Sequence, residues 1–188
     1  MILQYKDMRK WPEHVVLFLG RITFQKGPEY FIEAAAKVIP NVPDVVFVMA
    51  GAGDMLAKVK NRVRELGIEQ HFQFPGFLRG AKLEEVFSAA DLYVMPSVSE
   101  PFGISALEAI SFDTPAIISK QSGVAEVLDH ALKVDFWDVE RMADLMINAL
   151  SYKDLRSDLV SMARSEVGRL RWDASAKKVA AVYRSVVD

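Results

Sequence analysis

The sequence predicts an α/β fold in which a parallel sheet of about six strands carries helices on both faces and ends in a helical C-terminal third. Three observations support this prediction. Short runs of apolar and β-branched residues alternate with longer amphipathic stretches. The short runs are apolar almost throughout, which is typical of strands covered on both faces. From residue 138 onward the apolar residues recur only at helical spacing.

Each short run is the length of one strand and is followed by a helical pattern or a turn. The runs are 14–20 (HVVLFLG), 44–51 (DVVFVMAG), 71–76 (HFQFPG), 91–96 (DLYVMP), 114–119 (TPAIIS) and, more faintly, 131–134 (ALKV). Crossovers between parallel strands in one sheet are expected to be right-handed.

The helices between the runs have recognisable ends. Pro28 stands where a first helical turn tolerates proline, and apolar residues follow it at helical spacing. Asp54 is expected to cap the next helix, which Gly67 would end. Two short helices are expected at 82–89 and 103–111.

Composition limits the functions that the chain can have. A length of 188 residues fits one domain, and a net charge of −2 gives no general attraction to nucleic acid or to an anionic membrane. The absence of cysteine excludes disulfides and cysteine-bound zinc. No apolar run approaches the about 20 residues of a membrane span, and we expect a cytoplasmic location. Residues 1–13 are expected to be the remnant of an interdomain linker, and residues 14–188 the domain itself.

The loop after the first run carries two cations. In parallel sheets ligands bind beyond the carboxyl ends of the strands, where loops meet helix N-termini. Arg21 and Lys26 flank this strand-to-helix turn. Free N–H groups at a helix N-terminus favour an anion, and nearby cations reinforce the effect. Two solvated surface cations would explain the same residues, so this segment alone leaves both interpretations open.

The loop after the fourth run has the features of a second ligand-binding segment. Pro101 is compatible with a first helical turn, and Gly103 would let a ligand approach the backbone closely. The N–H groups of Phe102, Gly103 and Ile104 are then expected to point at the ligand. Glu100 stands before the expected helix.

Glu100 and Glu108 are candidate ligand-binding acids. Eight residues of helix rise about 12 Å, whereas the paired carboxylates of glycoside hydrolases lie roughly 5–5.5 Å or 6.5–9.5 Å apart. On one helix the two acids are too far apart to flank a glycosidic bond, although a position of Glu100 off the helix would shorten the gap. They could instead hold opposite ends of an elongated ligand. Compensation of the helix dipole by Glu100 and solvation of Glu108 are the plainer alternatives.

Neither a metal nor a cofactor is expected. The segment 51–54 falls short of the glycine fingerprint for dinucleotides. The three histidines are scattered, and no Asp-x-Asp pair is present to hold a metal against a diphosphate. Arg21 and Lys26 are left to neutralise a diphosphate.

Two motifs, in order, resemble those of retaining glycosyltransferase family 4. Residues 100–108 (EPFGISALE) resemble its E-P-F-G-x-x-x-x-E signature, and residues 20–27 (GRITFQKG) resemble its G-R-x-x-x-x-K-G loop. Shorter matches lie at 48–54, 74–77, 90–97 (ADLYVMPS), 107–109 (LEA), 114–115 (TP), 171–173 (RWD) and 183–184. The resemblance thus covers nearly the whole chain.

The resemblance implies one half of a GT-B fold, which consists of two Rossmann-like domains with a cleft between them. This chain resembles the C-terminal domain, whose ligand is a nucleotide-sugar donor. An N-terminal domain that binds the acceptor would then be missing. The fragment alone is expected to bind nucleotide and to transfer little or no sugar.

The resemblance also implies roles for individual residues. Arg21 and Lys26 would bind the donor diphosphate and stabilise its charge as it leaves, and Glu100 would bind the sugar hydroxyls beside the backbone of residues 102–104. Glu108 would bind the ribose hydroxyls. The segment that would lie near the base consists of Gly76, Phe77 and Leu78.

The sequence departs from the family pattern outside these motifs. The family's G-G-x-x-E reads SGVAE at 122–126, and its C-G before T-P is Phe112-Asp113. No sugar specificity is therefore predicted. Two alternatives to a family 4 transferase remain. One is a non-catalytic nucleotide-binding or regulatory module, and the other is a related GT-B enzyme of another class, such as a glucan (glycogen or starch) synthase, a phosphorylase-like enzyme or a sugar 2-epimerase.

Overall fold

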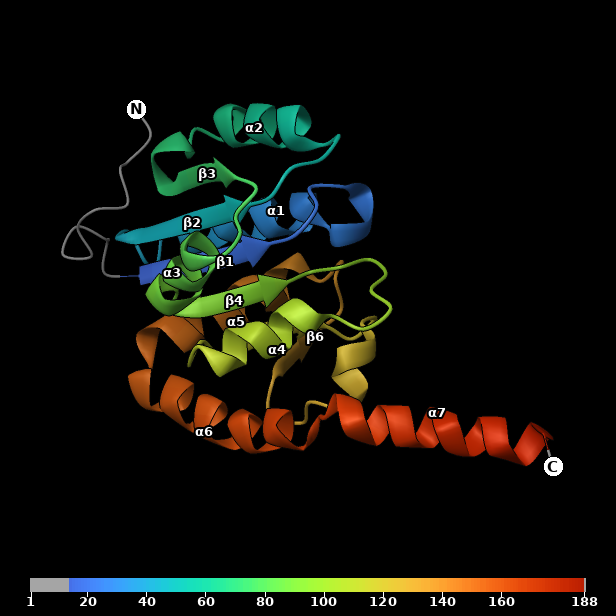
Figure 1. The fold of residues 1–188 in the computed structure, drawn as a ribbon. Helices are drawn as coiled ribbons and strands as arrows, with labels where there is room; N and C mark the ends of the chain where they lie inside the picture. Colours follow the sequence, from blue (N-terminus) through green and yellow to red (C-terminus); the bar gives the residue numbers. More distant parts are fainter. Residues whose placement is uncertain (1–13, 188) are drawn as a thin grey trace.

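The sheet has six strands, all parallel, in the order β3-β2-β1-β4-β5-β6 (Figure 1). It is seen in a computed structural model that describes residues 14–187. The predicted fold class is confirmed, and all six apolar runs form strands. The expected linker at 1–13 lies outside the described residues.

Strands and helices alternate along the chain until the last three helices. The strands are β1 (His14–Leu19), β2 (Val45–Ala50), β3 (Phe72–Gly76), β4 (Leu92–Met95), β5 (Ala116–Ser119) and β6 (Leu132–Val134). The helices are α1 (Pro28–Val38), α2 (Leu56–Glu65), α3 (Ala81–Ala89), α4 (Ile104–Ser111), α5 (Val139–Ser151), α6 (Lys153–Arg169) and α7 (Trp172–Val187). Three short 3-10 helices are η2 (Phe24–Lys26), η3 (Glu69–His71) and η4 (Gly123–Glu126).

The strand order determines where a ligand can bind. From β1 the chain adds β2 and β3 on one side, and then crosses to β4, β5 and β6 on the other. The loops after β1 and β4 therefore leave the sheet in opposite directions at its centre. In open parallel sheets this switch point, at the carboxyl ends of the strands, is where ligands bind.

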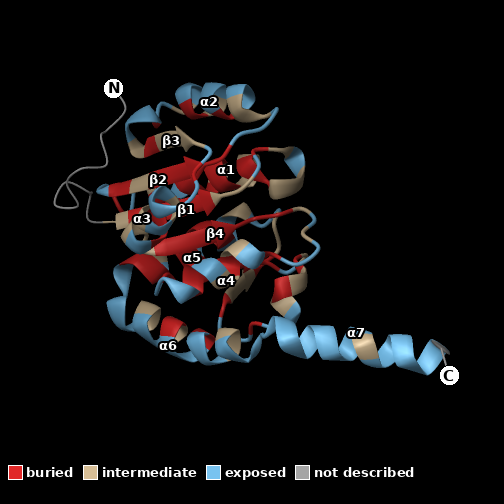
Figure 2. Ribbon diagram, in the orientation of Figure 1, coloured by how far each residue is buried: buried red, intermediate tan, exposed pale blue. Residues whose placement is uncertain are grey.

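A separate apolar core covers each face of the sheet. One core joins the strands to α1, α2 and α5 through residues such as Phe31, Val59 and Met142. The other joins them to α3, α4 and α6 through residues such as Phe87 and Ile110. Figure 2 shows strands of the sheet centre buried between these layers. This burial explains why the strand sequences are continuously apolar.

Two local predictions are wrong. Asp54 does not cap α2, because Met55 is the N-cap residue and its N–H donates to the Ile22 carbonyl, so the chain stays attached to the β1 loop until the helix begins at Leu56. Pro101 does not lie in the first turn of α4, which begins at Ile104. The residues before that helix are instead held to the loop after β5 by the bonds described below.

Helix α7 extends away from the domain (Figures 1 and 2). Its apolar side chains are exposed, with Trp172 at 81%, Tyr183 at 70% and Val186 at 79%. A helix of this length is marginal in water unless an apolar face is packed. An exposed apolar stripe of this kind is typical of a surface that contacts another domain or protein. Among the described helices, none is both long and apolar enough to cross a membrane.

The carboxyl ends of β1, β2 and β3 meet backbone to backbone. The N–H of Gly20 donates to the Ala50 carbonyl, and the N–H of Gly51 donates to the Gly76 carbonyl. A Cβ on Gly51 would lie 1.8 Å from the Gly20 carbonyl oxygen, and its φ of +147° also disfavours a side chain. Only glycine lets these strand ends approach so closely.

We therefore expect Gly51→Ala to destabilise the domain strongly. Backbone strain should cost about 1–2 kcal/mol, and the clash with Gly20 should add about 1–3 kcal/mol. The control is Gly67→Ala, because Gly67 also has a positive φ, of +68°, but a Cβ added there would meet no atom within 4 Å. The free energy of unfolding is measured in urea for both variants. Equal losses would contradict the close approach of Gly51 to Gly20.

Candidate functional site

The loop after β1 is anchored on both sides and carries Lys26 at its end. Ile22 is buried, and its N–H donates to the Ala52 carbonyl at 2.9 Å. Gly27 follows Lys26 with a φ of +66°, and a Cβ there would lie 2.0 Å from the carbonyl oxygen of Pro96. The backbone beside Lys26 therefore packs directly on the loop after β4.

The loop after β4 is held by backbone hydrogen bonds from two directions. The N–H of Val98 donates to the Gln25 carbonyl at 2.9 Å, which joins this loop to the residue before Lys26. On the other side, the N–H of Gly123 donates to the Glu100 carbonyl at 3.0 Å. Glu100 is thereby fixed between the loops that follow β1 and β5.

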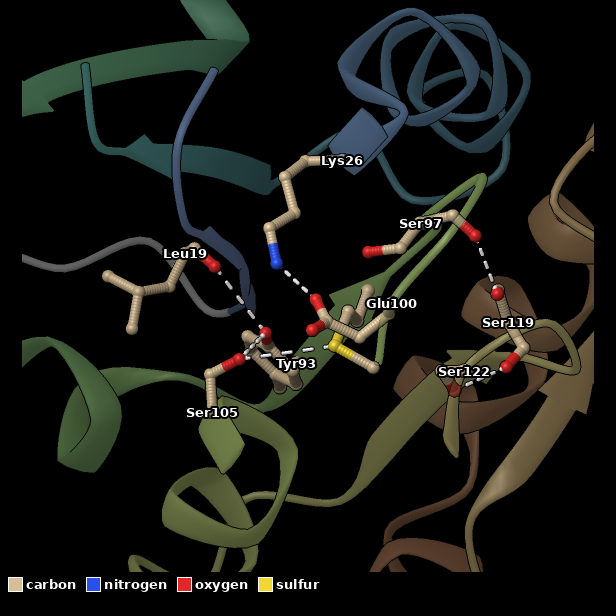
Figure 3. A network of polar contacts seen from close by, with 9 residues as sticks. Leu19, Lys26, Tyr93, Ser97, Glu100, Ser105, Ser119 and Ser122 are labelled. Atoms are coloured by element: carbon tan, nitrogen blue, oxygen red, sulfur yellow. Dashed lines mark hydrogen bonds and ion pairs between the residues drawn. The ribbon is translucent and has the colours of Figure 1, made fainter. Parts of the chain in front are cut away.

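Lys26 and Glu100 form an ion pair at the switch point of the sheet. The Lys26 Nζ donates to a carboxylate oxygen of Glu100. Figure 3 shows the two side chains pointing toward one another from separate loops. Their side chains are only 22% and 11% exposed. The structure thus brings together two of the site residues predicted from sequence, which lie 74 positions apart.

Arg21 and Glu108 take more open positions. Both residues are exposed, and within the described part of the chain neither makes an ion pair or a side-chain hydrogen bond. The structure therefore does not join either of them to the pair of Lys26 and Glu100. Because Glu100 precedes α4, the helical estimate of about 12 Å does not apply to its separation from Glu108.

Both acids nevertheless lie near one buried tyrosine. Burial raises the pKa of Tyr93, and the negative charges of Glu100 and Glu108 raise it further, whereas a hydrogen bond with Ser105 lowers it. The Tyr93 hydroxyl lies 2.7 Å from Ser105 Oγ at the first turn of α4. Tyr93 therefore stays neutral.

The segment Phe102, Gly103 and Ile104 offers free backbone donors. Within residues 14–187, none of their N–H groups donates to a protein acceptor. Phe102 and Ile104 are 37% and 51% exposed. Gly103 is buried and has a φ of +110°, which disfavours a side chain, and a Cβ there would also press on Met95 Cε at 2.8 Å and on Val124 at 3.0 Å.

The segment Gly76, Phe77 and Leu78 begins at the last residue of β3, two strands from β1. Gly76 is tied to β2 through its carbonyl. Phe77 is 68% exposed, and the guanidinium of Arg79 lies 5.1 Å from its ring centroid. Leu78 is buried in the core, so only its backbone can face a ligand.

A buried serine network supports the site, and it was not predicted from the sequence. Ser119 Oγ donates to the Ser97 carbonyl at 2.6 Å, and Ser122 Oγ donates to the Ser119 carbonyl at 2.6 Å. The small polar residues at the ends of β4 and β5 were the only feature of the sequence from which this network could have been predicted. The buried hydroxyls of Thr23 and Ser97 find no hydrogen-bond partner among the described residues. Such groups are uncommon in folded proteins and often accompany functional sites.

A cavity lined by charged residues lies away from this site. A cavity of 540 Å³ opens at the opposite edge of the sheet, where Asp91 and Asp113 precede β4 and β5. Arg156 and Arg164 line it and pair with these aspartates at 3.8 Å and 3.0 Å, which links α6 to the sheet. In the part of the chain that the structure describes, no three His, Asp or Glu side chains gather as they would around a metal ion.

Comparisons with known proteins all point to the same family. The family described as "Glycosyl transferases group 1" matches residues 6–166. An uncharacterised glycosyltransferase of Methanocaldococcus jannaschii is 34% identical over 181 residues, which are 94% of this chain and 46% of that protein. The chain spans about half the length of the curated relatives it matches.

Solved structures show the same fold. The C-terminal domain of a glycosyl transferase group 1 family protein from Francisella tularensis matches with a TM-score of 0.73 and 25% identity, covering 82% of this chain and 84% of that one. The Anabaena protein HepE, solved in complex with UDP-glucose, matches with a TM-score of 0.80 and 22% identity. That match covers 91% of this chain and 48% of HepE.

The serine network leads to a stability prediction. Ser119→Ala should cost about 1–3 kcal/mol, because it leaves the Ser97 carbonyl and the Gln121 N–H without their partner. Ser111→Ala is the control, since Ser111 is exposed on α4 and bonds only the Leu107 carbonyl of its own helix. Its effect should stay within about 0.5 kcal/mol. Equal unfolding free energies for the two variants would show that the network adds nothing to the fold.

Proposed function

The chain belongs to the glycosyl transferase group 1 family, and from that premise we propose that it binds the nucleotide-diphosphate sugar of a retaining sugar transferase. The observation that carries the proposal is the meeting of Lys26 and Glu100 at the switch point of the sheet. A cation at this position neutralises a diphosphate, and an acid beside it accepts hydrogen bonds from hydroxyl groups.

The cations supply the chemistry of bond breaking. In the transfer, the bond between the anomeric carbon and the diphosphate oxygen breaks, and negative charge grows on the departing nucleoside diphosphate. Lys26 and Arg21 stabilise that charge electrostatically. Lys26 is already positioned by Gly27 and Pro96, so it needs little reorganisation. Arg21 is exposed without a protein partner among the described residues, and it closes on the diphosphate from the solvent side.

The remaining site residues hold the two ends of the donor. Glu100 accepts hydrogen bonds from the sugar hydroxyls, beside the free N–H groups of residues 102–104. Glu108 accepts hydrogen bonds from the ribose hydroxyls. The base lies against the segment 76–78, where the exposed Phe77 ring is available for stacking. HepE was solved with UDP-glucose, and UDP is accordingly the first nucleotide to test.

A second domain completes the enzyme in this proposal. The match to a C-terminal domain and the chain's share of its relatives support an N-terminal half that binds the acceptor. The exposed apolar stripe of α7 supports it as well, because the stripe needs a covering partner.

Nucleotide binding by the isolated chain is the direct test. Calorimetry with UDP, GDP and ADP should detect at least one complex. Arg21→Ala and Lys26→Ala should each weaken that complex by about 1–3 kcal/mol, because each removes a charged hydrogen bond to the diphosphate.

The matched control for these variants is Arg164→Ala. It removes the same charge at the opposite edge of the sheet, where Arg164 pairs with Asp113 at 3.0 Å. Nucleotide affinity should not change in this variant. A folded chain that binds none of the three nucleotides, or that binds one equally well in all variants, would contradict the proposed donor site.

The two-domain proposal predicts that binding and transfer separate in the isolated chain. With radiolabelled UDP-glucose, the chain should retain donor and release no sugar to an added acceptor mixture, because the acceptor-binding half is absent. Calorimetry on the same preparation checks that the site is intact. Transfer by the chain alone would refute the assignment of the acceptor site to another domain.

A further inference from the structure

The ammonium group that the proposed function assigns to a diphosphate is already engaged. Lys26 Nζ donates to the Glu100 carboxylate, and both side chains are mostly buried. A diphosphate can reach Lys26 only by taking the place of this carboxylate or by sharing the ammonium with it. A retained carboxylate would then face the diphosphate at close range and repel it. Binding of the anion therefore involves an exchange between two negative groups.

The backbone around the ion pair is fixed by close contacts, so the exchange has to occur by movement of the side chains. Gly27 packs on the Pro96 carbonyl, and a Cβ on Gly123 would lie 2.3 Å from the Pro101 carbonyl oxygen. The Val98 N–H also donates to the Gln25 carbonyl. The loops that carry Lys26 and Glu100 are thus held in place at three points. Rotation of the Glu100 or the Lys26 side chain separates the pair without breaking these contacts.

The free-energy cost of this exchange differs between the sugar-bearing donor and the spent nucleotide, which is the nucleoside diphosphate that remains after transfer. When the nucleotide carries its sugar, the displaced Glu100 carboxylate finds new donors in the sugar hydroxyls. When the sugar has left, the carboxylate loses Lys26 and lacks these hydroxyl donors. The Tyr93 hydroxyl is already shared with Ser105, and the backbone N–H groups of residues 102–104 are the free protein donors beside it. A partly buried carboxylate with fewer hydrogen-bond donors is less favourable. The spent nucleotide therefore meets the stronger competition.

We propose that Glu100 competes with the diphosphate for Lys26 and thereby makes the site favour the sugar-bearing donor over the nucleoside diphosphate that remains after transfer. This inference rests on the proposed function. It gives Glu100 a role in specificity that hydrogen bonds to the sugar alone do not include. Return of the carboxylate to Lys26 also favours release of the spent nucleotide.

Pyrophosphate and UDP are the probes, because both carry the diphosphate and lack the sugar. Glu100→Gln removes the competing charge with little change of shape, and it should tighten both probes about three- to ten-fold, as expected for loss of one partly exposed charged contact. Affinity for UDP-glucose should not rise, because the same change weakens hydrogen bonds to the sugar. The ratio of UDP to UDP-glucose affinity should therefore shift toward UDP.

Glu108→Gln is the matched control for the pyrophosphate arm. It makes the same chemical change on α4 at a residue that does not pair with Lys26. Pyrophosphate lacks a ribose, so its affinity should change much less in Glu108→Gln than in Glu100→Gln. When Lys26→Ala is also present, Glu100→Gln should no longer raise pyrophosphate affinity more than Glu108→Gln does. The reason is that no ammonium group remains for the carboxylate and the diphosphate to compete for.

The outcomes separate this inference from the proposed function. Glu100→Ala is measured beside Glu100→Gln, and circular dichroism shows that each variant is folded. One outcome would overturn the proposed competition and leave the donor site standing. In that outcome, both Glu100 variants bind pyrophosphate and UDP no more tightly than the wild type, while Lys26→Ala still weakens binding of these probes. If Lys26→Ala has no effect on either probe, the diphosphate assignment itself fails.

Discussion

The close contact between Gly27 and Pro96 sets the geometry on which the rest of the site depends. A Cβ at Gly27 would lie 2.0 Å from the Pro96 carbonyl oxygen, so the loops after β1 and β4 touch backbone to backbone. These loops follow the two strands at which the sheet order changes direction. Their contact places an ammonium from one loop against a carboxylate from the other. The site is therefore a product of strand order and glycine packing together.

This arrangement suits electrostatic catalysis. A rigid backbone holds Lys26 in a partly buried position, where its charge is less screened than that of a fully exposed lysine. Glu100 compensates that charge through the ion pair. Arg21 remains exposed, as its proposed role in closing on the diphosphate requires. Family membership and the position of the pair at the switch point support the same donor-binding interpretation.

The sequence was sufficient to predict the layers of the fold, because strands buried on both faces are continuously apolar and are therefore easily recognised. Its motifs also singled out Lys26 and Glu100, which the structure brings together. Local features that depend on tertiary backbone contacts were missed. Asp54 has the chemistry of a cap, but bonds to the β1 loop shift the helix start to Leu56. The ion pair between Lys26 and Glu100 and the serine network involve residues distant in sequence, and no local pattern reports them.

A crystal structure of this chain with UDP tests the central claim most directly, because it locates the anion relative to Lys26. We expect phosphate oxygens within hydrogen-bond distance of the Lys26 ammonium, with the Glu100 side chain rotated away and the backbone from Pro96 to Gly103 unmoved. The contrary result is UDP bound elsewhere, for example in the cavity beside Arg156 and Arg164, with the pair between Lys26 and Glu100 intact.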